Sequence, residues 1–152
     1  MLNELYQEII LDHTRTPRNF GALVNPSHQA EGFNPLCGDR IQLFLKVNKN
    51  DIIEEIKFQG AGCAISTASA SLMTDYLLGK NLSEAKKIFE EFIKLLTQDS
   101  DNFPKELGKL LVFSGVKAYP ARVKCATLAW HALEAALNHT QALVSTENNA
   151  ES

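Results

Sequence analysis

The order in which apolar residues change their spacing along the chain is the strongest constraint on its fold. Apolar and polar residues alternate in two neighbouring segments, 41–47 and 52–59, which predicts two half-buried strands. The turn sequence Asn48-Lys49-Asn50-Asp51 lies between them and predicts a hairpin, with Ile52, Ile56 and Phe58 on one face of its second strand. Helical spacing or helix-start signals predict helices over residues 2–13, 64–78, 83–96, 104–112 and 120–137.

This order, one helix, then strands, then four helices, has no strand-helix-strand alternation. It predicts an α+β domain in which a small antiparallel sheet of about three strands is covered by a layer of helices. We expect the third strand as a short edge strand around residues 29–33, within an irregular segment rich in proline. For the helix expected over residues 83–96, Ser83 is the expected N-cap.

The length and composition limit the number of domains and the kinds of partner. At 152 residues the chain can form one core without disulfides. We expect this single domain to cover residues 1–140 and residues 141–152 to form a polar, flexible tail. The net charge is −3, and Lys and Arg do not cluster, so nucleic acid is not an expected partner.

The chain also lacks the sequence signals of membrane insertion and secretion. No stretch approaches the ~18 consecutive apolar residues of a membrane span, and residues 1–6 lack the basic start of a secretory signal. We therefore expect a cytoplasmic protein without a membrane partner. In that reducing compartment, three cysteines serve metal binding, catalysis or packing rather than a disulfide framework.

Each cysteine lies in a distinctive local sequence. Cys37 belongs to a Cys37-Gly38-Asp39 loop, in which Gly38 allows the backbone to turn so that Cys37 and Asp39 face one ion. Three thiolates and one carboxylate are a suitable tetrahedral ligand set for a thiophilic metal. The hypothesis is therefore a metal site formed by Cys37, Asp39, Cys63 and Cys125.

Cys63 and Cys125 are both expected near helix starts, where free amides and the positive helix end favour a thiolate. A simpler interpretation exists for each of them. The glycines before Cys63 also suit a tight turn, and Cys125 fits an apolar stripe with Leu128 and Leu133, as a core cysteine would. The sequence does not decide whether the cysteines converge.

Cationic residues and histidines are further candidates for a role at such a site. Zinc with three thiolates and one carboxylate carries net negative charge, which neighbouring cations would balance. Arg40, Arg122 and Lys124 stand next to candidate ligands, and of these Arg122 is the candidate for a functional role. None of the four histidines adjoins a cysteine, so structural or surface roles are expected for them.

Five ordered motifs resemble those of the NifU/IscU family of iron-sulfur cluster assembly proteins, over residues 1 to about 140. The chain looks most like the SufU branch, because Lys124 stands where IscU proteins have a histidine and the interval from Cys63 to Cys125 is longer. The resemblance implies a SufE/NifU-like fold. The motifs are residues 5–13, residues 17–21, Cys37-Gly38-Asp39, residues 60–64 and Lys124-Cys125.

The resemblance implies a zinc-dependent sulfur carrier in iron-sulfur cluster biogenesis, and the enzyme class that corresponds to this role is a zinc-dependent sulfurtransferase. Cys37 would accept persulfide sulfur from a SufS-type cysteine desulfurase and pass it to the downstream assembly machinery. Zn²⁺ would be held by Cys37, Asp39, Cys63 and Cys125. The alternative is a scaffold on which a transient [2Fe-2S] cluster is assembled on the same ligands. A purely structural zinc site is disfavoured, because a chain of this length needs no metal to fold.

Overall fold

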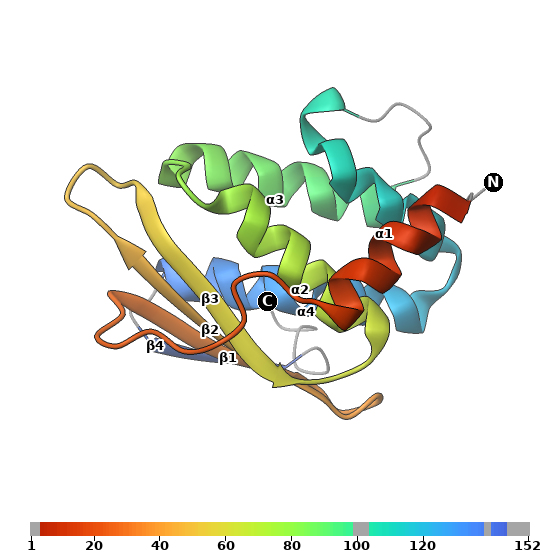
Figure 1. Ribbon diagram of the computed structural model, residues 1–152, viewed down its shortest axis with the longest axis horizontal. Helices are drawn as coiled ribbons and strands as arrows, with labels where there is room; N and C mark the ends of the chain where they lie inside the picture. Colours follow the sequence, from red (N-terminus) through yellow and green to blue (C-terminus); the bar gives the residue numbers. More distant parts are fainter. Residues whose placement is uncertain (1–3, 99–103, 139–140, 146–152) are drawn as a thin grey trace.

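The computed structural model describes residues 4–98, 104–138 and 141–145, which form a four-stranded sheet with helices packed on one of its faces (Figure 1). The strands are β1 (His28–Asn34), β2 (Asp39–Val47), β3 (Ile53–Ala61) and β4 (Gln141–Ser145). The helices are α1 (Glu4–Arg15), α2 (Ala64–Leu77), α3 (Leu82–Thr97), the 3-10 helix η1 (Lys105–Ala118) and α4 (Pro120–Asn138).

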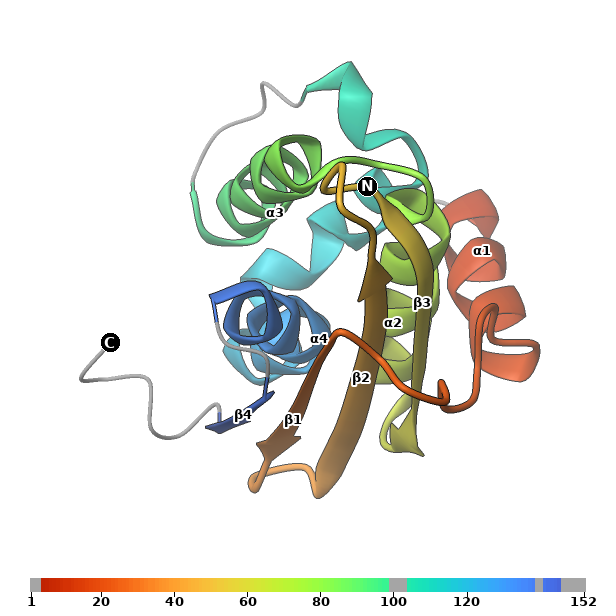
Figure 2. The same cartoon turned by 90° about the vertical axis from the view of Figure 1, so that its left-hand side faces the viewer.

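The sheet order is β3-β2-β1-β4, and the first three of these strands pair antiparallel. Alternate residues of β2, among them Ile41, Leu43 and Leu45, are buried beneath the helices. Helices α2 and α4 lie against this face, while α3 and η1 form a further layer beyond them (Figure 2). The predicted α+β class, with about three antiparallel strands under helices, is confirmed. None of the helices in the described ranges is long and apolar enough to span a membrane.

The second strand of the predicted hairpin differs from expectation in which of its residues are buried. The β2–β3 register shifts between Lys46 and Val47, and as a result Ile53 rather than Ile52 is buried in line with Ile56. A bulge of this kind adds a residue on one strand and reverses which side chains face the core.

Helix α3 is capped by Asn81 rather than Ser83. The Asn81 side chain accepts the Glu84 amide at 2.8 Å, and the Glu84 carboxylate accepts the Asn81 amide at 3.1 Å. This reciprocal pair satisfies two free donors at the helix start, whereas a serine two positions later would leave them open.

The expected tail begins with an ordered strand. Residues 141–145 form β4, which pairs parallel with β1 from Gln29↔Gln141 to Phe33↔Ser145. The segment holds three successive apolar residues, Ala142, Leu143 and Val144, and of these Val144 favours a strand although the composition of the whole segment is polar. The remaining part of the expected tail, 146–152, lies outside the described residues.

Helix α2 is the centre of the core because its small polar residues hydrogen-bond to the elements on either side. Ser69 donates to the Ala126 carbonyl of α4 at 2.6 Å and accepts from the Trp130 indole at 3.0 Å. The Trp130 ring stacks on Phe92 of α3, with centroids 4.4 Å apart. Burying a polar group costs little folding free energy only when the group is hydrogen-bonded in this way.

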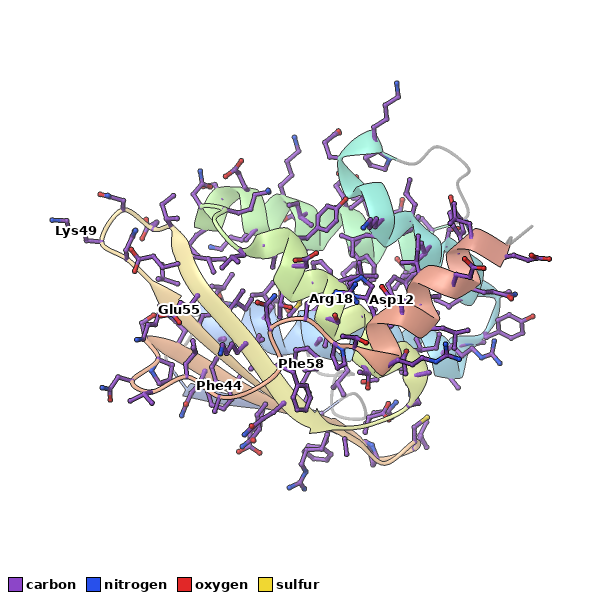
Figure 3. All side chains as sticks on the ribbon, in the orientation of Figure 1. Asp12, Arg18, Phe44, Lys49, Glu55 and Phe58 are labelled. Atoms are coloured by element: carbon purple, nitrogen blue, oxygen red, sulfur yellow. The ribbon has the colours of Figure 1, made fainter. Side chains whose placement is uncertain are left out.

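On its other side α2 holds α1 and the segment that follows it. Ser71 lies 2.7 Å from Nδ1 of His13 and accepts the Arg18 amide at 2.8 Å. Arg18 in turn donates to the Asp12 carboxylate at 2.7 Å (Figure 3). His13 is only 3% exposed, so its role is structural, as expected from the sequence.

Residues 19–21 cover the outer edge of β3. The Gly21 amide donates to the Phe58 carbonyl at 2.7 Å, and the Phe58 amide donates to the Asn19 carbonyl at 3.1 Å. Phe20 packs edge-on against Phe58 with ring centroids 5.3 Å apart. This motif therefore closes a sheet edge that would otherwise expose unpaired backbone groups.

Stability should fall in mild acid through His13. Burial lowers the pKa of His13 in the folded state, so the unfolded chain binds that proton more tightly. The contribution of this group is full above pH ~6.5 and declines as the pH falls below that value. We expect His13→Gln to flatten the pH dependence of the unfolding free energy between pH 5 and 7 by at most ~1.4 kcal/mol per pH unit, measured by urea titration.

His131→Gln is the matched comparison, because burial lowers the pKa of His131 as well. Each variant should remove only the contribution of its own histidine to the pH dependence of the unfolding free energy. A His13→Gln protein with the wild-type pH dependence would contradict this account.

Candidate metal centre

The four candidate ligands come from separate parts of the chain and lie close together near the edge of the sheet where β1 and β3 end and β2 begins. Figure 2 shows these strand ends side by side. Cys37 lies in the β1–β2 loop, and Asp39 is the first residue of β2. Cys63 is the N-cap of α2, while Cys125 lies in the second turn of α4. The antiparallel hairpins bring the strand ends to one edge, and both helices present their N-terminal ends there.

The ligand atoms of Cys37, Asp39 and Cys125 all lie within 4.8 Å of one another. The two sulfurs, Sγ of Cys37 and Sγ of Cys125, are 3.6 Å apart. Two thiolates on one tetrahedral zinc ion, each at ~2.3 Å, would be ~3.8 Å apart, so these residues fit such an ion.

Cys63 adjoins this group through Asp39. Its amide donates to Oδ1 of Asp39 at 2.9 Å, and its Sγ lies 3.8 Å from Oδ2. The Cys63 sulfur also accepts the Ser66 amide at 3.4 Å, which makes it the cap of α2. A thiolate is well placed there, because free amides and the positive end of the helix favour negative charge.

Burial differs sharply among these residues. Asp39 is 1% exposed and Cys125 is 4% exposed, whereas Cys63 is half-buried and Cys37 is exposed. Burial, followed by hydrogen bonding with Cys63 and Cys37, raises the pKa of the Cys125 thiol. A bound cation would oppose this effect, since metal coordination deprotonates a thiol.

Two glycines allow the chain to approach the site. Gly38 has φ +73°, a left-handed conformation that glycine adopts without steric cost, so the loop can turn between Cys37 and Asp39. A Cβ on Gly62 would lie 2.9 Å from Oδ1 of Asp39 and 3.2 Å from its Cγ. The start of α2 can therefore lie directly against the carboxylate only with glycine at position 62.

The candidate cation Arg122 is exposed at the start of α4, one turn before Cys125. Its guanidinium lies over the ring of Tyr119, 4.8 Å from the ring centroid. A cation–π contact of this kind holds the side chain near the surface without removing its charge from water.

Asn34 was not selected from the sequence, yet it is fully buried beside the sulfurs. Its Nδ2 lies 3.7 Å from Sγ of Cys125. The available signal was a polar residue at the end of an edge strand, three positions before Cys37. This signal is weak, because asparagine is common at such turns.

Replacing Gly62 should weaken metal binding without a general loss of folding. In Gly62→Ala the methyl group must push the Asp39 carboxylate out of place, so we expect zinc affinity to fall ~10-fold or more, measured by competition with a chromophoric chelator. Gly79→Ala is the control for replacing a glycine away from the site, because a Cβ there meets no atom within 4 Å; its φ of +86° means that this variant can lose stability, but its zinc affinity should stay unchanged. Equal zinc affinity of Gly62→Ala and wild type would place Asp39 outside the metal centre.

The chain is similar to known proteins over most of its length. The family model described as NifU-like N terminal domain matches residues 5–144. A zinc-dependent sulfurtransferase SufU from Bacillus subtilis is 44% identical over 88% of this chain and 89% of its own. An iron-sulfur cluster assembly scaffold protein IscU from Streptococcus pyogenes is 40% identical over 91% of this chain and 86% of its own.

A solved structure agrees with these sequence matches. The crystal structure of a SufU protein from Fervidobacterium islandicum superposes with a TM-score of 0.79 at 36% identity, over 86% of this chain and 94% of that one. The family model, the sequence identity and the fold all agree, and the chain belongs to the NifU-like N-terminal domain family.

Proposed function

We propose that this protein is a zinc-dependent sulfur carrier in iron-sulfur cluster biogenesis, and that Cys37 receives sulfur from the persulfide of a cysteine desulfurase. One observation carries the proposal. The sulfur of Cys37, an exposed residue, lies 3.6 Å from the sulfur of the buried Cys125, in a group that also includes the buried Asp39. The Bacillus subtilis relative, named a zinc-dependent sulfurtransferase, supports it.

Cys37, Asp39, Cys63 and Cys125 would hold the zinc. The ion is redox-inert and would keep these thiols deprotonated in a place where burial favours the protonated form. About one zinc per chain is expected from this ligand set.

Cys37 is the ligand that the chain can release most easily. It lies in a loop, and it is the one exposed cysteine of the three. Cys63 is held by its bond from Ser66, and Cys125 is buried within α4. A loop residue moves at lower cost than a residue inside a helix.

The transfer is a thiol exchange in which atoms and electrons balance. The Cys37 thiolate attacks the outer sulfur of the desulfurase persulfide, and a new S–S bond forms on Cys37. The S–S bond of the desulfurase breaks, and its electron pair leaves with the desulfurase cysteine as a thiolate. The protein then carries one additional sulfur on Cys37, which the downstream assembly machinery receives by the same exchange.

We further propose a cytoplasmic location and two partners, a SufS-type cysteine desulfurase and the downstream iron-sulfur assembly machinery. The thiol chemistry requires a reducing compartment. The second candidate function is a scaffold for a transient [2Fe-2S] cluster on the same ligands, which the IscU relative supports. A stable iron-sulfur spectrum in zinc-free protein purified without oxygen would favour the scaffold.

Cys37→Ser should abolish sulfur acceptance, because a hydroxyl is a poor sulfur acceptor, while much of the zinc stays on the remaining ligands. Cys125→Ser should instead lose zinc and lower the thermal midpoint, since metal binding stabilises the folded state by linkage. Incubation with desulfurase and cysteine should add one sulfur to wild type, assigned to Cys37 by peptide mass spectrometry. A persulfide confined to Cys63 or Cys125 would overturn this role.

Arg122 is proposed to assist the exchange by attracting the anionic persulfide. Arg122→Ala should slow sulfur acceptance ~10-fold with unchanged zinc content, and the loss should shrink at high salt because an exposed charge is screened. Arg40→Ala is the matched control, since Arg40 is also exposed and next to a ligand in sequence. Equal rates for Arg122→Ala and wild type would remove Arg122 from the mechanism.

A further inference from the structure

We propose that Asn34 is a positioning residue whose side-chain amide donates to the Cys125 sulfur and thereby keeps Cys125 the resident ligand, while its neighbour Cys37 accepts sulfur. The hydrogen bond is a property of the chain itself. Only the assignment of Cys37 as the acceptor rests on the proposed function.

The environment of Asn34 determines which way its amide points. The side chain is 0% exposed at the end of β1, and its Oδ1 accepts the Leu36 amide at 3.3 Å. An amide oxygen accepts and an amide nitrogen donates, so this bond directs Nδ2 toward Sγ of Cys125, 3.7 Å away. These two partners therefore assign Oδ1 to the side of Leu36 and Nδ2 to the side of Cys125.

The main chain of the same residue holds the turn that carries Cys37. The Asn34 carbonyl accepts from the Cys37 amide at 3.2 Å and from the Gly38 amide at 2.9 Å. Asn34 thus contacts Cys125 through its side chain and the Cys37 turn through its carbonyl. A side-chain substitution removes the first contact and leaves the carbonyl in place, which makes the two roles separable.

A hydrogen-bond donor to a buried thiolate stabilises the negative charge on the sulfur and orients it as a ligand, and it makes the sulfur a weaker nucleophile toward an electrophile. Such charge-assisted bonds are strongest where water is excluded, and Cys125 is 4% exposed. The residue Cys37 is exposed, and the buried side-chain amide of Asn34 is directed at Cys125. Of two sulfurs 3.6 Å apart, the one without this donor is the better nucleophile.

Cobalt(II) substituted for zinc reports the bond directly, because the energy of its sulfur-to-metal charge-transfer band follows the electron density on the sulfur. Asn34→Leu removes both the donor and the Oδ1 acceptor, whereas Asn34→Asp keeps the acceptor for Leu36 and removes the donor. We expect both variants to shift the band to lower energy and to bind zinc ~10-fold more weakly. Gln42→Leu, which removes the amide bonded to Gln59 at 2.8 Å on the other face of the sheet, should leave the band unchanged.

Two patterns would overturn the proposal. A wild-type band in Asn34→Asp with a shifted band in Asn34→Leu would mean that Asn34 only supports the turn. A wild-type band in Asn34→Leu with a shifted band in Asn34→Asp would mean that added charge alone moves it. The band is read only from protein that has bound cobalt, so a partly unfolded sample does not alter its energy.

The wild-type protein provides a test that needs no variant to fold. With cadmium-113 in the site, a side-chain N–H of Asn34 bonded to a ligand sulfur should show scalar coupling to the metal in NMR. An assigned Asn34 amide without that coupling would overturn the bond.

Sulfur transfer then tests the acceptor choice. Wild type incubated with desulfurase and cysteine should carry its persulfide on Cys37, and Asn34→Leu should place a measurable share on Cys125. A persulfide confined to Cys37 in Asn34→Leu would overturn the role in acceptor choice. A wild type that gains no sulfur at all would contradict the proposed function instead, while the cobalt and cadmium results would still decide the hydrogen bond.

Discussion

The buried carboxylate of Asp39 is the group on which the organisation of this end of the molecule depends. Burying a charge is costly unless other groups compensate it. Here the compensation comes from the Cys63 amide, which donates at 2.9 Å, and from the positive N-terminal end of α2 that Cys63 caps. The glycine at position 62 allows this close approach. The bond joins the first residue of β2 to the start of α2, so the same contact that orders the fold also sets two candidate ligands side by side.

Helix α2 transmits this arrangement to the rest of the core. Its start carries Cys63, and its middle holds α4 through Ser69 and α1 through Ser71. Helix α4 also carries Cys125. The hydrogen bond from Ser69 to the Ala126 carbonyl therefore helps to fix the position of the Cys125 sulfur relative to Cys63. The motif at 17–21 belongs to the same framework, since it packs on α2 and closes the edge of β3. Residues that define a family by sequence can thus serve packing as well as chemistry.

Within the cluster, the protein combines sulfurs of different character at short distance. Cys125 is buried, lies in a helix and faces the amide of Asn34, whereas Cys37 is exposed in a loop that Gly38 allows to turn. A sulfur carrier needs both kinds, because a ligand that retains the metal and a ligand that exchanges have opposite requirements for access and electron density. The short loop between β1 and β2 brings the two kinds into contact.

The local elements could be predicted from the amino-acid sequence, because alternation and helical spacing reflect which face of a segment is buried. The sequence also indicates Cys37, Asp39, Cys63 and Cys125 as candidate ligands, since their chemistry is a property of the side chains. Features that depend on partners far away along the chain could be seen only in the folded structure. The burial of Ile53 follows from a bulge in β3, and β4 exists because the edge of β1 is available to pair with it. Asn34 gains its role for the same reason: its partner Cys125 is 91 residues away, and no local pattern encodes a contact across that separation.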